Sequence, residues 1–150
     1  MTGAYRLLGL LGLLLVLFHP GEAAAQDAER IAVLQFSGPM PDGVLMTLTD
    51  EARSGALSAV RGLNYTVMTR ENTYTLLVEQ GLDPEACVAE ANCEVEFGQN
   101  IGAALVVSGM IVDVEGNLNL TMKLFETERG GNFLGSRRVT AQGAQDLIDA

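Results

Sequence analysis

Residues 30–36 read Arg-Ile-Ala-Val-Leu-Gln-Phe, a nearly continuous apolar run with the length of one strand. Such a run is typical of a central strand whose two faces are both covered. Turn-forming residues follow at 37–43, and apolar side chains at helical spacing then mark residues 44–61. The next β-rich stretch is residues 64–69. Because a helix-length connection joins strands that run parallel, these elements predict a parallel β-α-β unit.

The second half of the chain has the pattern of an antiparallel meander. Helices are expected at residues 71–80 and 92–101 and at the start of 142–150, and strands at residues 105–114, 118–127 and 133–141. Asn92 is the expected N-cap of the middle helix and Gly102 its expected end. Together these elements predict one α/β domain with an α+β tendency, whose helices pack on a mixed sheet of about five strands in the order β-α-β-α-(α)-β-β-β-α.

The amino-terminal residues have the three-part layout of a secretory signal. One basic residue precedes the apolar run 7–18, and a small-residue stretch ends at Ala25. We expect cleavage between Ala25 and Gln26, so that residues 1–25 are a signal peptide and residues 26–150 form the working domain. The alternative is an uncleaved anchor, but the run is shorter than the roughly 20 apolar residues that span a bilayer. The sequence therefore predicts a periplasmic or secreted protein without a stable membrane anchor after cleavage.

Charge and residue usage exclude several function classes. The formal net charge is −10, and a domain this acidic repels phosphates, which argues against nucleic acid as a partner. The single histidine, His19, lies in the predicted signal peptide. Residues 26–150 therefore lack the imidazole that catalytic triads and many zinc sites need. No phosphate-binding loop, dinucleotide fingerprint or nucleophile elbow is present. We expect no enzyme activity, no cofactor and no metal.

A cluster of carboxylates leaves one catalytic alternative open. Such side chains could act as an acid and base pair or bind calcium, but they lack the spacing of an EF-hand loop. The simpler interpretation is a solvated acidic helix face. The cluster consists of Asp83, Glu85, Glu90, Glu94 and Glu96.

Two further features are candidate sites. The loop at the carboxyl end of the first strand lies where open α/β sheets commonly bind ligands, although a plain connector is the simpler interpretation. Arg137 and Arg138 in the last strand either blunt an exposed sheet edge or contact an acidic partner. The candidate interaction loop consists of Ser37, Gly38, Pro39, Met40, Pro41, Asp42 and Gly43.

The motifs on residues 30–36, 67–73, 79–81 and 101–109, with the two cysteines and the strand at 118–126, resemble exported domains related to the amino-terminal domain of TolB. The curli-assembly lipoprotein CsgG and the penicillin-binding-protein activator LpoB are similar as wider relatives. The resemblance implies a non-catalytic module that docks onto other envelope proteins. It transfers no binding residue, because the shared motifs determine the fold.

Two function hypotheses follow. The first is an exported, non-catalytic protein-interaction module of the bacterial cell envelope, whose partners are envelope proteins; a homo-oligomer is left open. The second is a periplasmic small-molecule or ion-sensing domain that uses the loops at the carboxyl ends of the parallel strands.

Cys87 and Cys93 lie in a chain that leaves the reducing cytoplasm, so we predict that they form a disulfide. A redox or metal pair is the alternative, but the spacing is not C-x-x-C and no further soft ligand is present. Closing this short loop stabilises the fold by roughly 2 to 3 kcal/mol. Iodoacetamide should therefore add no mass to the exported protein before reduction and two adducts after reduction and unfolding. Two adducts without reduction would contradict the disulfide.

Overall fold

The computed structural model describes residues 27–83 and 92–150. The element order is strand, helix, strand, two helices, three strands and a short helix, which confirms the predicted α/β class. The elements are β1 (Glu29–Val33), α2 (Asp42–Ala59), β2 (Tyr65–Val67), α3 (Arg70–Glu79), α4 (Cys93–Ile101), β3 (Leu105–Val114), β4 (Asn117–Glu126), the 3-10 turn Glu128–Gly130, β5 (Asn132–Ala141) and α5 (Ala144–Ile148).

One mixed sheet of five strands runs in the order β2-β1-β3-β4-β5. The strand β1 is parallel to both of its neighbours, with Ile31 opposite Val67 of β2 and Leu105 of β3. The remaining pairs, β3 with β4 and β4 with β5, are antiparallel. The predicted combination of a parallel unit and an antiparallel meander is therefore confirmed, and both halves share one sheet.

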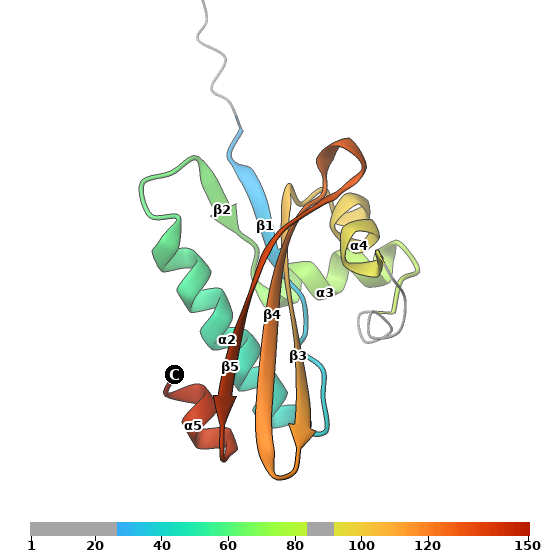
Figure 1. Ribbon diagram of the computed structural model, residues 1–150. Helices are drawn as coiled ribbons and strands as arrows, with labels where there is room; N and C mark the ends of the chain where they lie inside the picture. The colour runs from blue at the N-terminus through green and yellow to red at the C-terminus, as the bar shows by residue number, and fades with distance from the viewer. Residues whose placement is uncertain (1–26, 84–91) are drawn as a thin grey trace, which may run out of the picture.

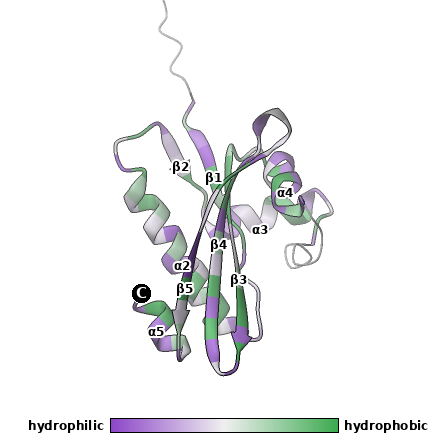
Figure 2. Ribbon diagram, viewed as in Figure 1, coloured by the Kyte–Doolittle hydropathy of each residue, from purple (hydrophilic) through white to green (hydrophobic). Residues whose placement is uncertain are grey.

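Helices cover both faces of the sheet (Figure 1). On one face, Leu45 and Leu48 of α2 and Leu147 of α5 pack with the odd-numbered residues Ile31 and Val33 of β1. On the other face, Leu77 of α3 and residues Phe97 and Ile101 of α4 pack with Ala32, Leu34 and Val106. Both faces of β1 are buried, as its apolar run predicts. Towards the β3–β4 turn, hydrophobic and hydrophilic residues alternate (Figure 2), because only one face of the sheet is covered there.

The first strand ends earlier than the sequence predicts. It pairs with β3 only as far as Val33 opposite Val107, and the chain returns to β3 at Ser37, which bridges Met110. From Val33 to Ser37 the chain advances four residues, whereas β3 advances only three, from Val107 to Met110. The longer segment therefore bulges out of the sheet. The backbone N–H of Phe36, which cannot reach β3, donates instead to Thr49 Oγ1 of α2 at 3.0 Å.

Helix boundaries also differ from the predicted ones. Helix α2 begins at Asp42, so Asp42 and Gly43 belong to its first turn and not to the loop assigned from the sequence. Asn92 occupies the N-cap position of α4, as predicted, but its backbone is left-handed (φ 77°) and its side chain makes no capping hydrogen bond. Gly102 ends α4 in the left-handed conformation, as predicted. The closing helix spans only Ala144–Ile148.

Glycine at position 109 permits the closest packing in the core. Phe36 is 1% exposed, and its ring lies against β3 at Gly109. A Cβ atom built on Gly109 would lie 2.6 Å from Phe36 Cδ1. A side chain at this position would therefore push the aromatic ring out of its site.

We predict that Gly109→Ala lowers the free energy of unfolding by about 1–3 kcal/mol, the usual cost of overpacking a core. Gly135→Ala is the matched control, because Gly135 also lies in a strand and a Cβ atom there meets nothing within 4 Å. Urea unfolding of both variants measures the difference. Equal midpoints for the two variants would contradict the packing argument.

Candidate functional site

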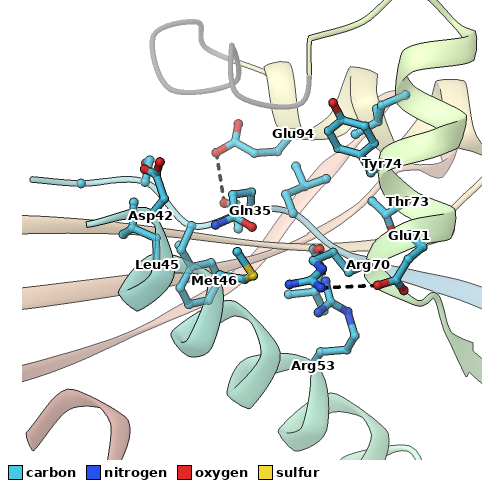
Figure 3. Close-up of a pocket in the computed structure, with 18 of the residues that line it drawn as sticks. Gln35, Asp42, Leu45, Met46, Arg53, Arg70, Glu71, Thr73, Tyr74 and Glu94 are labelled. Atoms are coloured by element: carbon cyan, nitrogen blue, oxygen red, sulfur yellow. Dashed lines mark hydrogen bonds and ion pairs between the residues drawn. The ribbon is translucent and has the colours of Figure 1, made fainter. Parts of the chain in front are cut away.

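A cavity of about 790 Å³ opens at the carboxyl end of β1. Its walls come from the chain that follows β1, from α2 and α3, and from Glu94 at the start of α4 (Figure 3). Ser108 and Gly109 of β3 contribute on the sheet side. The cavity therefore forms where two parallel strands and three helices meet.

The topology explains why a cavity forms at this point. After β1 the chain crosses to β2 through α2 on one face of the sheet, and after β2 it passes over the other face, through α3 and α4, to β3 on the far side of β1. The connections thus diverge between β1 and β3. In open α/β sheets such a topological switch point leaves a crevice at the carboxyl ends of the strands, and ligands bind there.

Apolar side chains form much of the cavity. Leu34, Phe36 and Leu77 line it from the core, where each is at most 3% exposed. Met46 of α2 and Tyr74 of α3 also line it and are 39% and 57% exposed, so they stand nearer to solvent. Exposed large apolar side chains around a concave site are typical of ligand-binding pockets.

Two arginines form a basic side of the cavity. Arg53 of α2 is 9% exposed; its Nη2 donates to the carbonyl oxygen of Val33 at 3.1 Å, and its Nη1 pairs with Asp50. The Nε atom of Arg53 is buried and has no hydrogen-bond partner among residues 27–83 and 92–150. Arg70 of α3 lies 3.5 Å from carboxylate oxygens of both Asp50 and Glu71. The Glu71 carboxylate accepts a hydrogen bond from the backbone N–H of Glu71, which lowers the pKa of this carboxyl group. The positive charge of Arg70 lowers it further.

Carboxylates form the opposite side (Figure 3). Asp42 lies in the first turn of α2 and is exposed. Glu94 is largely buried; its Oε1 accepts a hydrogen bond from Ser108 Oγ at 3.2 Å and lies 3.8 Å from Lys123 Nζ. The lining thus carries charges of both signs: Asp42 and Glu94 lie opposite the arginines, and Glu71 lies beside Arg70.

A second surface lies on the sheet itself. Beyond the part covered by α3 and α4, Met110, Val112 and Val114 of β3 are 40%, 44% and 51% exposed. The pairing registers place polar residues beside them on the same face: Asn117, Asn119, Thr121 and Lys123 of β4, and Ser136, Arg138 and Thr140 of β5. We call these ten side chains the open sheet face. It carries two positive charges and no carboxylate.

The predicted candidate residues are dispersed. Ser37, Gly38 and Asp42 line the cavity, whereas Met40 packs against the core. Arg137 and Arg138 are both exposed on β5, which is an edge strand of the sheet.

Several predicted residues lie outside the described part of the chain. These are Ala25, Gln26, Cys87, Glu85 and Glu90. Cys93 is buried at the start of α4, but its pairing with Cys87 stays a prediction. Of the acidic cluster, Glu94 faces the cavity and Glu96 is exposed.

Sequence reasoning missed Arg53 and Arg70. The signal for Arg53 is its position, because it follows Leu45 by eight residues and Thr49 by four and so falls on the buried stripe of α2. No spacing rule marks Arg70, which reaches the cavity from the first position of α3.

No family model matches the chain, and no curated protein matches it. Solved structures do match the chain. The carboxyl-terminal domain of LpoB from Salmonella enterica is 14% identical and superposes with a TM-score of 0.55 over 81% of this chain and 87% of that one. The chain has the fold of the LpoB domain. The Escherichia coli LpoB domain agrees, with 15% identity and a TM-score of 0.55 over 83% of this chain and 90% of that one.

Lipoprotein GNA1162 from Neisseria meningitidis has the same fold as LpoB, with 15% identity to this chain and a TM-score of 0.57 over 78% of this chain and 82% of its own. TolB from Acinetobacter baumannii scores lower, at 0.46, over 81% of this chain and 25% of TolB. LpoB and GNA1162 are therefore the better references for the fold, and the likeness to CsgG stays a prediction.

The described residues contain neither a candidate membrane span nor a candidate metal site. No helix within residues 27–83 and 92–150 is both long and apolar enough to span a membrane. In the same part of the chain, no three His, Cys, Asp or Glu side chains gather where they could hold a metal ion.

Asp50 compensates the buried charge of Arg53 and also pairs with Arg70. We predict that Asp50→Asn lowers the free energy of unfolding by about 1–2 kcal/mol, because a hydrogen bond to a charged group is lost while the exposure of Asp50 limits the cost. Glu51→Gln, an exposed change on the same helix, should be neutral. Thermal unfolding distinguishes them, and a neutral Asp50→Asn would show that Val33 alone satisfies Arg53.

Proposed function

We propose that the chain is an exported, non-catalytic protein-interaction domain of the bacterial cell envelope. Residues 1–25 act as its signal peptide, and residues 26–150 work in the periplasm or outside the cell. The fold shared with LpoB and with a meningococcal lipoprotein supports this assignment. The lack of histidine after residue 19 supports a role without catalysis.

The open sheet face is the observation that carries the proposal. Met110, Val112 and Val114 expose a row of apolar side chains on the part of β3 that α3 and α4 leave uncovered. Contiguous exposed apolar surface rimmed by polar residues is typical of protein-binding sites. The row is flanked by asparagine, threonine and serine side chains, which can hydrogen-bond a partner without a large cost of desolvation.

Charge indicates the kind of partner. The chain carries a formal charge of −10, yet the open sheet face contributes two cations and no carboxylate. Lys123 lies 3.8 Å from Glu94 of α4, so Arg138 on the edge strand β5 is the main cation offered to a partner. Arg138 Nε donates to Thr121 Oγ1 at 3.4 Å, which holds the guanidinium over this face. The partner is therefore an envelope protein whose docking surface combines apolar side chains with carboxylates.

Site-specific photo-cross-linking in the native host tests this proposal. A photoreactive phenylalanine analogue at Val112 of the full chain should give a defined adduct with an envelope protein, whereas the same analogue at Leu57, 52% exposed on α2, should not. Arg138→Glu should remove the Val112 adduct by repelling the acidic partner, and Arg61→Glu, away from this face, should leave it in place. Adducts only with a second copy of the chain, or equal yields at both positions, would overturn the proposal.

A further inference from the structure

The cavity at the carboxyl end of β1 borders the open sheet face, because Glu94 in its lining lies 3.8 Å from Lys123. None of the ten side chains of the open sheet face lines the cavity, so a ligand there is separate from the docking proposed above. We propose that it binds a short peptide in its zwitterionic form. The peptide carboxylate lies at Arg53 and Arg70, the terminal ammonium lies at Asp42 and Glu94, and the side chains contact the apolar walls between them.

The buried guanidinium of Arg53 calls for an acceptor. Its Nη atoms are used by Val33 and Asp50, and its Nε has no partner among the described residues. Leaving a buried charged donor unpaired is costly, and natural proteins seldom do so without a function. Arg53 lines the cavity, and in the proposed complex its side chain turns so that the buried Nε meets an oxygen atom of the ligand.

Arg70 adds a second donor on the same wall. Its side chain is 41% exposed, and its contacts with Asp50 and Glu71 are both 3.5 Å long. Such long contacts at an exposed site hold a guanidinium weakly. Arg70 can therefore turn to a ligand carboxylate, which planar guanidinium groups bind through two parallel hydrogen bonds.

The opposite wall selects for a positive group. Asp42 and Glu94 face Arg53 and Arg70 across the cavity in Figure 3. Lys123 lies 3.8 Å from Glu94 and neutralises it only in part. A simple anion is disfavoured here by these carboxylates and by the net charge of −10, and a simple cation leaves Arg53 Nε unpaired. A zwitterion satisfies both walls.

The size and the middle of the cavity indicate a peptide. Its volume of about 790 Å³ lies towards the upper end of the range for small-molecule sites, which favours a short peptide over a single free amino acid. Leu34, Leu77 and Tyr74 line the space between the charged walls and can bury apolar side chains. The Gln35 amide, also in the lining, offers a donor and an acceptor to the peptide backbone.

Isothermal titration calorimetry of the exported chain with blocked peptides tests this inference directly. Trialanine and trileucine are compared with their N-acetyl and carboxyl-amide forms. We expect at least one free tripeptide to bind, and each blocked form of it to bind about tenfold more weakly or worse, which corresponds to a loss of one charged contact. No heat with either free tripeptide, or equal binding of free and blocked forms, would overturn the proposal.

Substitutions then assign the ends of the peptide. Arg70→Gln should weaken the free peptide and abolish its advantage over the amide, and Arg61→Gln, away from the cavity, should leave both unchanged. An Arg70→Gln variant that still discriminates against the amide would contradict the assignment. These experiments do not depend on the cross-linking at Val112, so the two proposals can fail separately.

Discussion

Helix α2 completes the hydrogen bonds that β1 loses where it leaves the sheet, and the rest of the site depends on this contact. Thr49 accepts from the backbone N–H of Phe36, and Arg53 donates to the carbonyl of Val33. Thr49 is fully buried and also donates to Leu45 on its own helix. Without these partners the bulge between Val33 and Ser37 would leave polar backbone groups buried and unpaired, which is one of the larger penalties a fold can carry. The cavity exists because this bulge is stable.

A buried arginine is an unusual way to stabilise a strand end. Taking a guanidinium out of water is costly, and well-packed apolar side chains often serve stability as well or better. Arg53 nevertheless lies at the centre of the cavity wall, with Asp50 shared between it and Arg70. The arrangement is easier to explain by what the arginine binds than by the stability it adds.

Sequence periodicity predicted the regular elements well where packing follows one repeating pattern. The strand at Leu105–Val114 has its predicted bounds, because its apolar residues begin at Leu105 and the Glu115-Gly116 turn, with φ of 54° and 83°, ends it. The end of β1 was misplaced because Leu34 and Phe36 are apolar and buried without being paired as strand. At Leu34 and Phe36 a side chain is buried although its backbone is not part of a strand. The apolar pattern of a sequence predicts burial and not strand pairing.

The cavity lies where the sequence predicted a candidate loop, but most of its charged lining was not predicted. The loop after β1 was predicted as a candidate because it follows the carboxyl end of a parallel strand. Ser37, Gly38 and Asp42 line the cavity. The charged groups come from α2, α3 and α4, and they meet only through the tertiary crossing of the chain, which no local pattern in the sequence encodes. Asn92 is at the predicted N-cap position, but its side chain makes no capping hydrogen bond, and its backbone has φ 77°.

The order of the strands also bears on how the molecule assembles. The pairs β3–β4 and β4–β5 join neighbours in the chain, and such local hairpins form quickly. The pairing of β1 with β3 is instead long-range, since Ile31 lies opposite Leu105. A polypeptide made from its amino terminus therefore produces β1 first, can pair it with β2 once Val67 is made, and pairs its second side only when β3 follows. Until residue 105 has emerged, this segment can collapse or aggregate, so the interval before closure is the stage at which the chain most needs a chaperone.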